Sequence, residues 1–107
     1  MKIITMCGSF KFRGDLIDWA EKLELEGNCV LIPIFNPNVD KSEYTSEELK
    51  LLGVMHKKKI GLSDAIFIVN KDGYIGSSTK SEIEYAKELG KEILFMENEP
   101  SCQTVLV

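Results

Sequence analysis

The sequence is poor in the residues that hold metal ions and disulfides. It has three cysteines, Cys7, Cys29 and Cys102, and one histidine, His56. The number of cysteines is odd, and their spacing lacks any CxxC or similar metal signature. A single histidine argues against a dedicated zinc site. We therefore expect a reduced, cytoplasmic protein with no structural metal.

Long apolar runs and a basic excess are also missing. No run approaches the roughly 20 apolar residues that span a bilayer, and Met1 leads directly into a strand-like run rather than a secretion leader. The formal net charge is -4, whereas non-specific binding to nucleic acids and membrane surfaces favours basic proteins. The 107 residues are 44% hydrophobic and 28% charged. These values predict one soluble domain over 1–107, with no membrane or nucleic-acid partner.

Four short apolar runs are continuous rather than alternating, which is typical of strands covered on both faces. They are residues 3–7, 29–34, 65–69 and 92–96. Helical patterns separate them, and the second pattern begins at Thr45, which has capping-box spacing to Glu48. This alternation predicts an α/β fold, a flavodoxin-like or Rossmann-like three-layer sandwich. We expect a parallel sheet of 4–5 strands in the order 2-1-3-4(-5), with 104–107 as the candidate fifth strand.

The segments between these elements carry further signals. Gly27 and Gly90 are placed to end the first and third helices in the left-handed conformation. The one long loop, 35–45, is expected to be a functional or mobile loop, or else a passive connection. Walker A and GxGxxG patterns are absent, so no ATP or NAD cofactor is expected.

Two loops rich in glycine and hydroxyl groups follow the first and third expected strands. Residues 7–15, CGSFKFRGD, offer Gly8, Ser9, Phe10 and Lys11. Residues 70–79, NKDGYIGSST, offer Asp72, Tyr74, Gly76 and Ser78. In such a sheet the ligand crevice lies beyond the carboxyl ends of the strands, at the switch point, and helix starts there favour an anionic or polyhydroxy ligand. We expect both loops to bind substrate, although each alone also fits an ordinary strand-to-helix connection.

Glu82 falls on the apolar side of the third expected helix, near its start, together with Ile83 and Ala86. One interpretation is capping, because Thr79 and Glu82 have capping-box spacing. The other is functional, since the positive end of the helix stabilises a negative charge in the first turn. A carboxylate at the crevice is suited to attack the electron-poor sugar carbon during glycosidic cleavage. The residues alone leave both interpretations open.

Three segments resemble the nucleoside 2-deoxyribosyltransferase family, which includes 2′-deoxynucleoside 5′-phosphate N-hydrolases. They are CGSFK (7–11), HKKKIGLSDAIFIVN (56–70) and SEIEYAKELGKEIL (81–94), and they lie in the family's order. The last carries the family's Glu–aliphatic–x–Tyr/Arg–Ala pattern, which aligns Glu82 with the family's nucleophilic glutamate. The resemblance implies cleavage of the N-glycosidic bond of a (deoxy)nucleoside or nucleoside 5′-monophosphate, with the sugar passed to another base or to water.

The resemblance implies further roles at matching positions. Gly8, Ser9 and Lys11 fall on a phosphate- or sugar-binding loop, in which lysine replaces the usual arginine and its bidentate fork. His56 stands where the family commonly has an aspartate, and it is expected to be an acid or hydrogen-bond donor, or else a structural histidine. Family members are assemblies in which a neighbouring subunit's tail completes the site, so a homodimer or larger homo-oligomer is expected.

The remaining candidates each have a structural alternative. Phe10, Phe12 and Tyr74 are expected to stack on a base, with at least one of the two phenylalanines packing in the core instead. Asp72 is expected to contact the ligand, or else to serve a turn, because Asp-Gly is a common turn pair. Two other functions stay open: a non-catalytic nucleotide-binding or signalling module, and a plain interaction domain without a small-molecule ligand.

Overall fold

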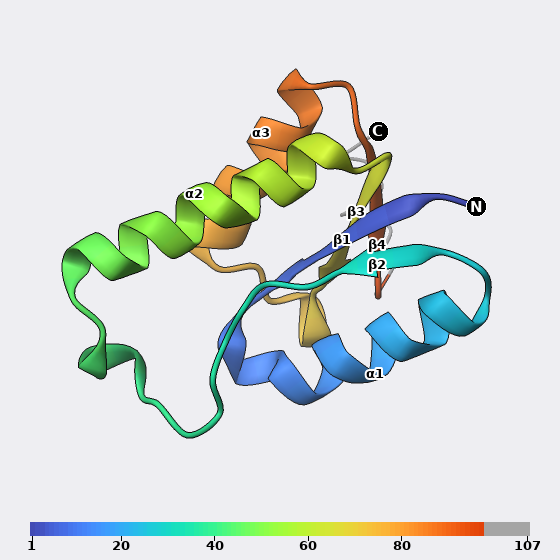
Figure 1. The fold of residues 1–107 in the computed structure, drawn as a ribbon. Coiled ribbons are helices and arrows are strands. Elements are labelled where there is room, and N and C mark those ends of the chain that lie inside the picture. Colours follow the sequence, from blue (N-terminus) through green and yellow to red (C-terminus); the bar gives the residue numbers. More distant parts are fainter. Residues whose placement is uncertain (98–107) are drawn as a thin grey trace.

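The computed structural model describes residues 1–97, which form a parallel sheet with helices on both faces (Figure 1). The strands are β1 (Ile3–Gly8), β2 (Cys29–Leu31), β3 (Ala65–Val69) and β4 (Glu92–Phe95). The α-helices are α1 (Arg13–Leu25), α2 (Ser46–Leu62) and α3 (Ser77–Glu88). Short 3-10 turns lie in the connections: η1 (Phe10–Phe12), η2 (Lys41–Glu43) and η3 (Lys71–Gly73). This is the flavodoxin-like three-layer sandwich that the alternating pattern predicts.

The strand order confirms the predicted switch point. The strands pair in the order β2-β1-β3-β4, and every pair is parallel. β1 and β3 form the centre and pair from Ile4 with Ala65 to Gly8 with Val69. The chain winds outward in opposite directions from this pair, so the ligand crevice is expected at the carboxyl ends of β1 and β3.

The second strand is shorter than its apolar run predicts. Of residues 29–34, only Cys29–Leu31 pair with β1. Pro33 has no N–H to donate to a strand ladder, and the Ile32 carbonyl accepts instead from the Lys59 ammonium at 2.9 Å. The candidate fifth strand, 104–107, lies outside the described residues.

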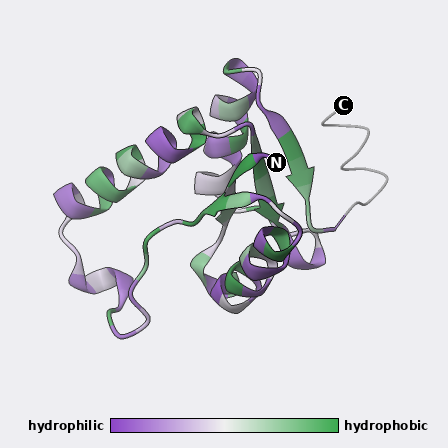
Figure 2. Ribbon diagram, turned by 45° about the vertical axis from the view of Figure 1, so that its right-hand side comes forward, coloured by the Kyte–Doolittle hydropathy of each residue, from purple (hydrophilic) through white to green (hydrophobic). Residues whose placement is uncertain are grey.

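Two apolar layers fill the space between the sheet and its helices, and Figure 2 shows the strands mostly in the hydrophobic colour. The layer under α1 consists of Ile4, Met6, Leu16, Leu23, Ala65, Phe67 and Val69. The layer under α2 and α3 consists of Cys7, Ile60, Ile66, Ile68, Ile83 and Ala86. Because successive strand residues point to opposite faces, Cys7 faces α2 and α3 while Met6 faces α1.

The helix ends follow local signals in most places. Thr45 and Glu48 form the predicted capping box at the start of α2. Gly27 and Gly90 follow α1 and α3 with φ angles of 98° and 71°, as predicted for left-handed stops. The start of α3 differs, because its N-cap is Gly76 and no side chain among residues 1–97 caps it. No helix in this part of the chain is long and apolar enough to cross a lipid bilayer.

Candidate functional site

A cavity of about 550 Å³ lies beyond the carboxyl ends of β1 and β3. We call it the main cavity, and its volume is typical of small-molecule sites. Its walls come from the residues after β1, β2 and β3, from one side of α2 and from the first two turns of α3. Most of the residues predicted from the sequence line it: Gly8, Ser9, Phe10, His56, Tyr74, Gly76, Ser78 and Glu82.

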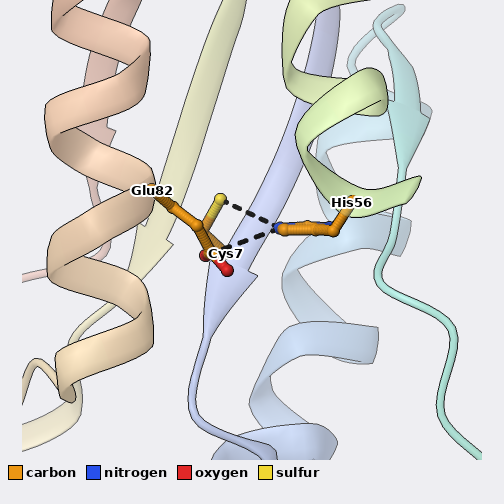
Figure 3. A group of neighbouring side chains, drawn as sticks. All are labelled: Cys7, His56 and Glu82. Carbon is orange, nitrogen blue, oxygen red and sulfur yellow. Dashed lines mark hydrogen bonds and ion pairs between the residues drawn. The ribbon is translucent and has the colours of Figure 1, made fainter. Parts of the chain in front are cut away.

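Glu82 reaches the main cavity from the second turn of α3 (Figure 3). Its side chain is 18% exposed, so the carboxylate is neither in bulk solvent nor sealed away from the cavity. We expected Glu82 in the first helical turn, but α3 starts at Ser77. The stabilisation of a charge by the helix end falls off within the first turn. The neighbouring side chains therefore set the environment of this carboxylate.

The capping interpretation of Glu82 is wrong. The N-cap of α3 is Gly76, three residues before Thr79. The Lys80 N–H already donates to the Gly76 carbonyl at 3.0 Å, and Thr79 is buried inside the helix. A capping box needs its hydroxyl residue at the N-cap, so Thr79 and Glu82 have the spacing of the motif without its position.

Cys7, His56 and Glu82 form a polar cluster from β1, α2 and α3 (Figure 3). His56 Nε2 lies 3.4 Å from Cys7 Sγ and 3.5 Å from Glu82 Oε1. Cys7 is fully buried, and the His56 side chain is 8% exposed. An ionised carboxylate only accepts hydrogen bonds, so the thiol and the imidazole N–H can both donate to it. The cluster fixes the Glu82 side chain on the wall of the main cavity.

The cluster lies in a strongly desolvated place. Burial raises the pKa of the Cys7 thiol well above its ordinary value, and the charge of Glu82 and a hydrogen bond to it raise the pKa further. Cys7 is therefore a neutral thiol. His56 Nδ1 is buried and has no hydrogen-bond partner within residues 1–97, so the imidazole contacts other polar side chains through Nε2 alone.

Gly8, the last residue of β1, allows the carboxyl ends of β1 and β3 to lie close together. It pairs with Val69, the last residue of β3, and a Cβ placed on Gly8 would lie 3.2 Å from both the Cβ and the carbonyl oxygen of Val69. Such contacts are tighter than packed side chains normally make, so glycine allows the close approach. Gly8 itself lines the main cavity.

The start of α3 presents backbone N–H groups to the main cavity. Gly76, Ser77 and Ser78 line it, and the helix has no side-chain cap within the described residues. The first N–H groups of an α-helix have no partner within the helix. Together with the positive helix end, they favour an anionic or polyhydroxy ligand. Ser9, on the opposite loop, accepts a hydrogen bond from the Lys11 N–H at 3.3 Å and caps η1.

Lys11 and Asp72 are not among the residues that line the main cavity, and their predicted contact with a ligand stays a prediction. The Lys11 ammonium lies 3.4 Å from the centre of the Tyr74 ring, a cation–π contact. Lys11 lines a neighbouring side cavity of about 260 Å³ instead. Asp72 is exposed, with a positive φ of 56°, and its N–H donates to the Glu97 carboxylate at 2.9 Å. Asp72 therefore lies in the turn η3, the position that the turn interpretation expects.

Two lysines outside the predicted substrate-binding residues, Lys41 and Lys59, also line the main cavity. The 35–45 loop mainly lines the side cavity and supplies Lys41 to both cavities. Within the loop, Asp40 and Glu43 form a capping box around η2. Cys7 was noted only for its lack of metal-type spacing. Its strand position, one residue before Gly8, was the available signal that it faces α2 and α3.

The main cavity is lined by one carboxylate, one imidazole, two ammonium groups and the uncapped start of α3. Such a site is suited to bind an anionic or polyhydroxy ligand and to present the carboxylate as a nucleophile. A scan against protein-family models and a search of curated proteins both found no match for the chain.

Proposed function

We propose that the protein cleaves the N-glycosidic bond of a nucleoside or nucleoside 5′-monophosphate, as a member of the nucleoside 2-deoxyribosyltransferase family. One observation carries the proposal. Glu82, the residue that the sequence resemblance aligns with a nucleophilic glutamate, lines the main cavity and is held there by His56 and Cys7.

In the proposed reaction, a Glu82 oxygen forms a bond to the sugar C1′ while the bond from C1′ to the base nitrogen breaks. The base leaves with the bonding electron pair and takes up a proton from solvent. Water or a second base then attacks C1′ and loses a proton to solvent, and the bond from C1′ to the carboxylate breaks. Because the transition state resembles an oxocarbenium ion, a nearby negative charge stabilises it. His56 serves as a hydrogen-bond donor that orients the carboxylate.

The substrate class follows from the walls of the cavity. Phe10 and Tyr74 have exposed rings at the cavity, suited to stack on a base. The uncapped start of α3 and the Lys41 ammonium are suited to a phosphate or to sugar hydroxyls. The lysines also balance the charge of Glu82 near an anionic ligand. These features favour a nucleoside 5′-monophosphate over an uncharged nucleoside.

The test is base release measured by chromatography, with a metal chelator present. The protein is incubated with ribo- and deoxynucleosides and their 5′-monophosphates, with and without a free acceptor base. We expect free base from at least one class. Transfer to the acceptor then distinguishes a transferase from a hydrolase.

Glu82→Gln is expected to lose base release, and Glu84→Gln is the matched control. Glu84 lies on the same helix, and its side chain is 71% exposed. A folded wild-type protein that releases no base from any substrate contradicts the proposal, as does an active Glu82→Gln variant.

A second candidate is a nucleotide-binding or signalling module without turnover. Glu82 is the one acidic residue lining the main cavity in the described part of the chain, whereas glycosidases commonly use two carboxylates. This candidate expects saturable binding of a nucleotide by wild type and by Glu82→Gln, with no free base from either. Calorimetric titration beside the chromatographic assay separates the two functions.

The proposal extends to a homodimer in a reducing, cytoplasmic location. Leu51, Val54 and Met55 are exposed large apolar side chains on α2, and a second copy covering them would bury this stripe. Cys7 and Cys29 are free thiols, which a reducing compartment preserves. Light scattering tests the dimer: we expect twice the chain mass for wild type and dissociation for Leu51→Asp. A single-chain mass for wild type contradicts it.

A further inference from the structure

The cluster of Cys7, His56 and Glu82 has a second property, which the proposed reaction does not use. It brings together one sulfur, one nitrogen and one oxygen donor from three different elements (Figure 3). The three donor atoms lie within 4.8 Å of one another. Two of the separations are 3.4 Å, from His56 Nε2 to Cys7 Sγ, and 3.5 Å, from His56 Nε2 to Glu82 Oε1. The second is longer than a strong hydrogen bond between nitrogen and oxygen.

These separations match the edges of a metal coordination tetrahedron. With metal–ligand bonds of about 2.0–2.3 Å, the donor atoms of a tetrahedral Zn²⁺ site lie roughly 3.3–3.8 Å apart. The two measured separations fall inside this interval. Two of the three edges therefore already have the length that a shared ion requires, and the third, from Cys7 to Glu82, is at most 4.8 Å.

We propose that Cys7, His56 and Glu82 bind a divalent transition-metal ion of the Zn²⁺ class. His56 and Glu82 both line the main cavity, so the fourth coordination position opens toward it. Three protein ligands with one open position is the pattern of accessible zinc sites rather than of closed structural ones. The inference does not depend on the proposed glycosidic cleavage.

The donor set selects the class of metal. A thiolate and an imidazole suit Zn²⁺ and its neighbours, whereas Mg²⁺ and Ca²⁺ take oxygen ligands. On binding, the Cys7 thiol loses its proton to solvent and its sulfur forms a bond to the metal. The ion also occupies a lone pair of Glu82, so the bound state withdraws this carboxylate from any attack on a ligand in the main cavity.

The affinity for the metal ion is limited because His56 Nδ1 has no hydrogen-bond partner within residues 1–97. A metal on Nε2 leaves the ring proton on Nδ1, which is buried and has no partner within residues 1–97. Metal-binding histidines usually donate this proton to a second group, and its loss weakens binding by about 10–100-fold. We therefore expect reversible binding that a chelator removes.

The test is a spectroscopic titration with Co²⁺ alone, in a Cys29→Ser, Cys102→Ser background that leaves Cys7 as the one thiol. Tetrahedral Co²⁺ with a thiolate ligand gives a near-ultraviolet charge-transfer band and intense visible bands. We expect both, and we expect Zn²⁺ to displace them. Absence of the charge-transfer band in the folded protein overturns the proposal.

Variants assign the ligands. Cys7→Ser and Cys7→Ala are each expected to remove the charge-transfer band, while His56→Asn and Glu82→Gln keep it and weaken Co²⁺ binding by at least tenfold. Glu84→Gln is expected to bind as wild type does. Unchanged affinity in Glu82→Gln, or in His56→Asn, overturns the assignment. Circular dichroism verifies folding. Because the readout needs no substrate and base release is assayed with a chelator, failure of one proposal leaves the other intact.

Discussion

The starts of α2 and α3 carry the same Thr-x-x-Glu spacing and use it differently. At α2, Thr45 accepts a hydrogen bond from the Glu48 N–H at 3.0 Å, and Glu48 accepts one from the Thr45 N–H at 2.9 Å. At α3, the corresponding Thr79 and Glu82 lie inside the helix, because hydrogen bonding already starts at Gly76. The position of the helix start therefore decides whether the glutamate closes the helix end or faces a cavity.

The comparison has a consequence for ligand binding. At the start of α2, Glu48 accepts a hydrogen bond from the Thr45 N–H. That backbone donor is therefore satisfied within the protein. The start of α3 leaves its N–H groups beside the main cavity and places its glutamate on the cavity wall. The candidate site therefore combines the uncapped start of α3 with the Glu82 carboxylate.

Replacing each of the two glutamates in turn gives the largest expected difference in base release. Glu82→Gln is expected to lower base release by roughly a thousandfold or more, since it removes the nucleophile, without loss of folding stability. Glu48→Ala is expected to leave base release within about twofold and to lower stability by about 0.5–1 kcal/mol, since it opens the capping box. Chromatography and urea unfolding measure the two effects. Equal loss of activity in both variants contradicts the distinction.

Cys7 offers a second way to compare the two glutamates, because it contacts Glu82 and not Glu48. Its thiol is buried, and its pKa is raised by burial first and by Glu82 second. The thiolate, the reactive form, is therefore scarce near neutral pH. We expect iodoacetamide at pH 8, with a chelator present, to modify Cys7 about a hundredfold more slowly than the exposed Cys29.

Peptide mass spectrometry in a Cys102→Ser background measures the two rates. Glu82→Gln is expected to accelerate Cys7 modification only a few-fold, because burial, the larger cause, persists. Glu48→Gln should change nothing. Equal rates at Cys7 and Cys29 in the folded protein rule out this environment for Cys7.

Adding a cap to α3 makes it resemble α2. Gly76 has φ -75° and ψ 170°, a conformation open to any residue, so Gly76→Asp is expected to cap the helix and to stabilise it by about 0.5 kcal/mol. The new carboxylate competes with an anionic ligand for the N–H groups. We expect nucleoside monophosphates to bind about tenfold more weakly.

Thr45→Asp is the control for this change, since it replaces one good cap with another and is expected to leave binding unaltered. Calorimetry with a nucleoside monophosphate and with the matching nucleoside measures the difference. A Gly76→Asp variant that binds the monophosphate as tightly as wild type shows that the helix start does not bind the phosphate.

Removing the hydroxyl groups gives the smallest contrast. Thr45→Ala is expected to lower the free energy of unfolding by about 1 kcal/mol, because its hydroxyl satisfies an N–H at the helix start. Ser78→Ala, in the first turn of α3, is expected to stay within about 0.5 kcal/mol of wild type. Urea unfolding measures both. If Ser78→Ala lowers the free energy of unfolding by more than this, the Ser78 hydroxyl does stabilise the start of α3, and the absence of a side-chain cap there is contradicted.

The fold was predictable because its signals are local and repeated. Continuous apolar runs mark buried parallel strands, and their alternation with helices left few strand orders to consider. Strand ends were less predictable: the 29–34 run ends early because Pro33 lacks an N–H and the Ile32 carbonyl bonds to Lys59. Such long-range competition for a carbonyl leaves no local pattern.

The site was predictable where topology fixes position. Gly8 ends β1, and Tyr74 and Gly76 follow β3, so these three residues line the main cavity at the carboxyl ends of the central strands. The cluster was not predictable from spacing, since Cys7, His56 and Glu82 lie on three separate elements. The single histidine argued against any dedicated zinc site, and the proposed metal site departs from that expectation. Capping at Glu82 could not be decided either, because the sequence does not say which of Gly76, Ser77 or Thr79 starts the helix.

The 35–45 loop encodes its own shape through the Asp40–Glu43 capping box. It lines the side cavity and supplies Lys41 to the main cavity, whereas Glu82 is carried by α3. Replacing this one segment would therefore change the volume and polarity of the side cavity, and remove one cation from the main cavity, without moving Glu82. Under the proposed function, grafting loops of other lengths offers a route to redesigned specificity that leaves the proposed nucleophile in place.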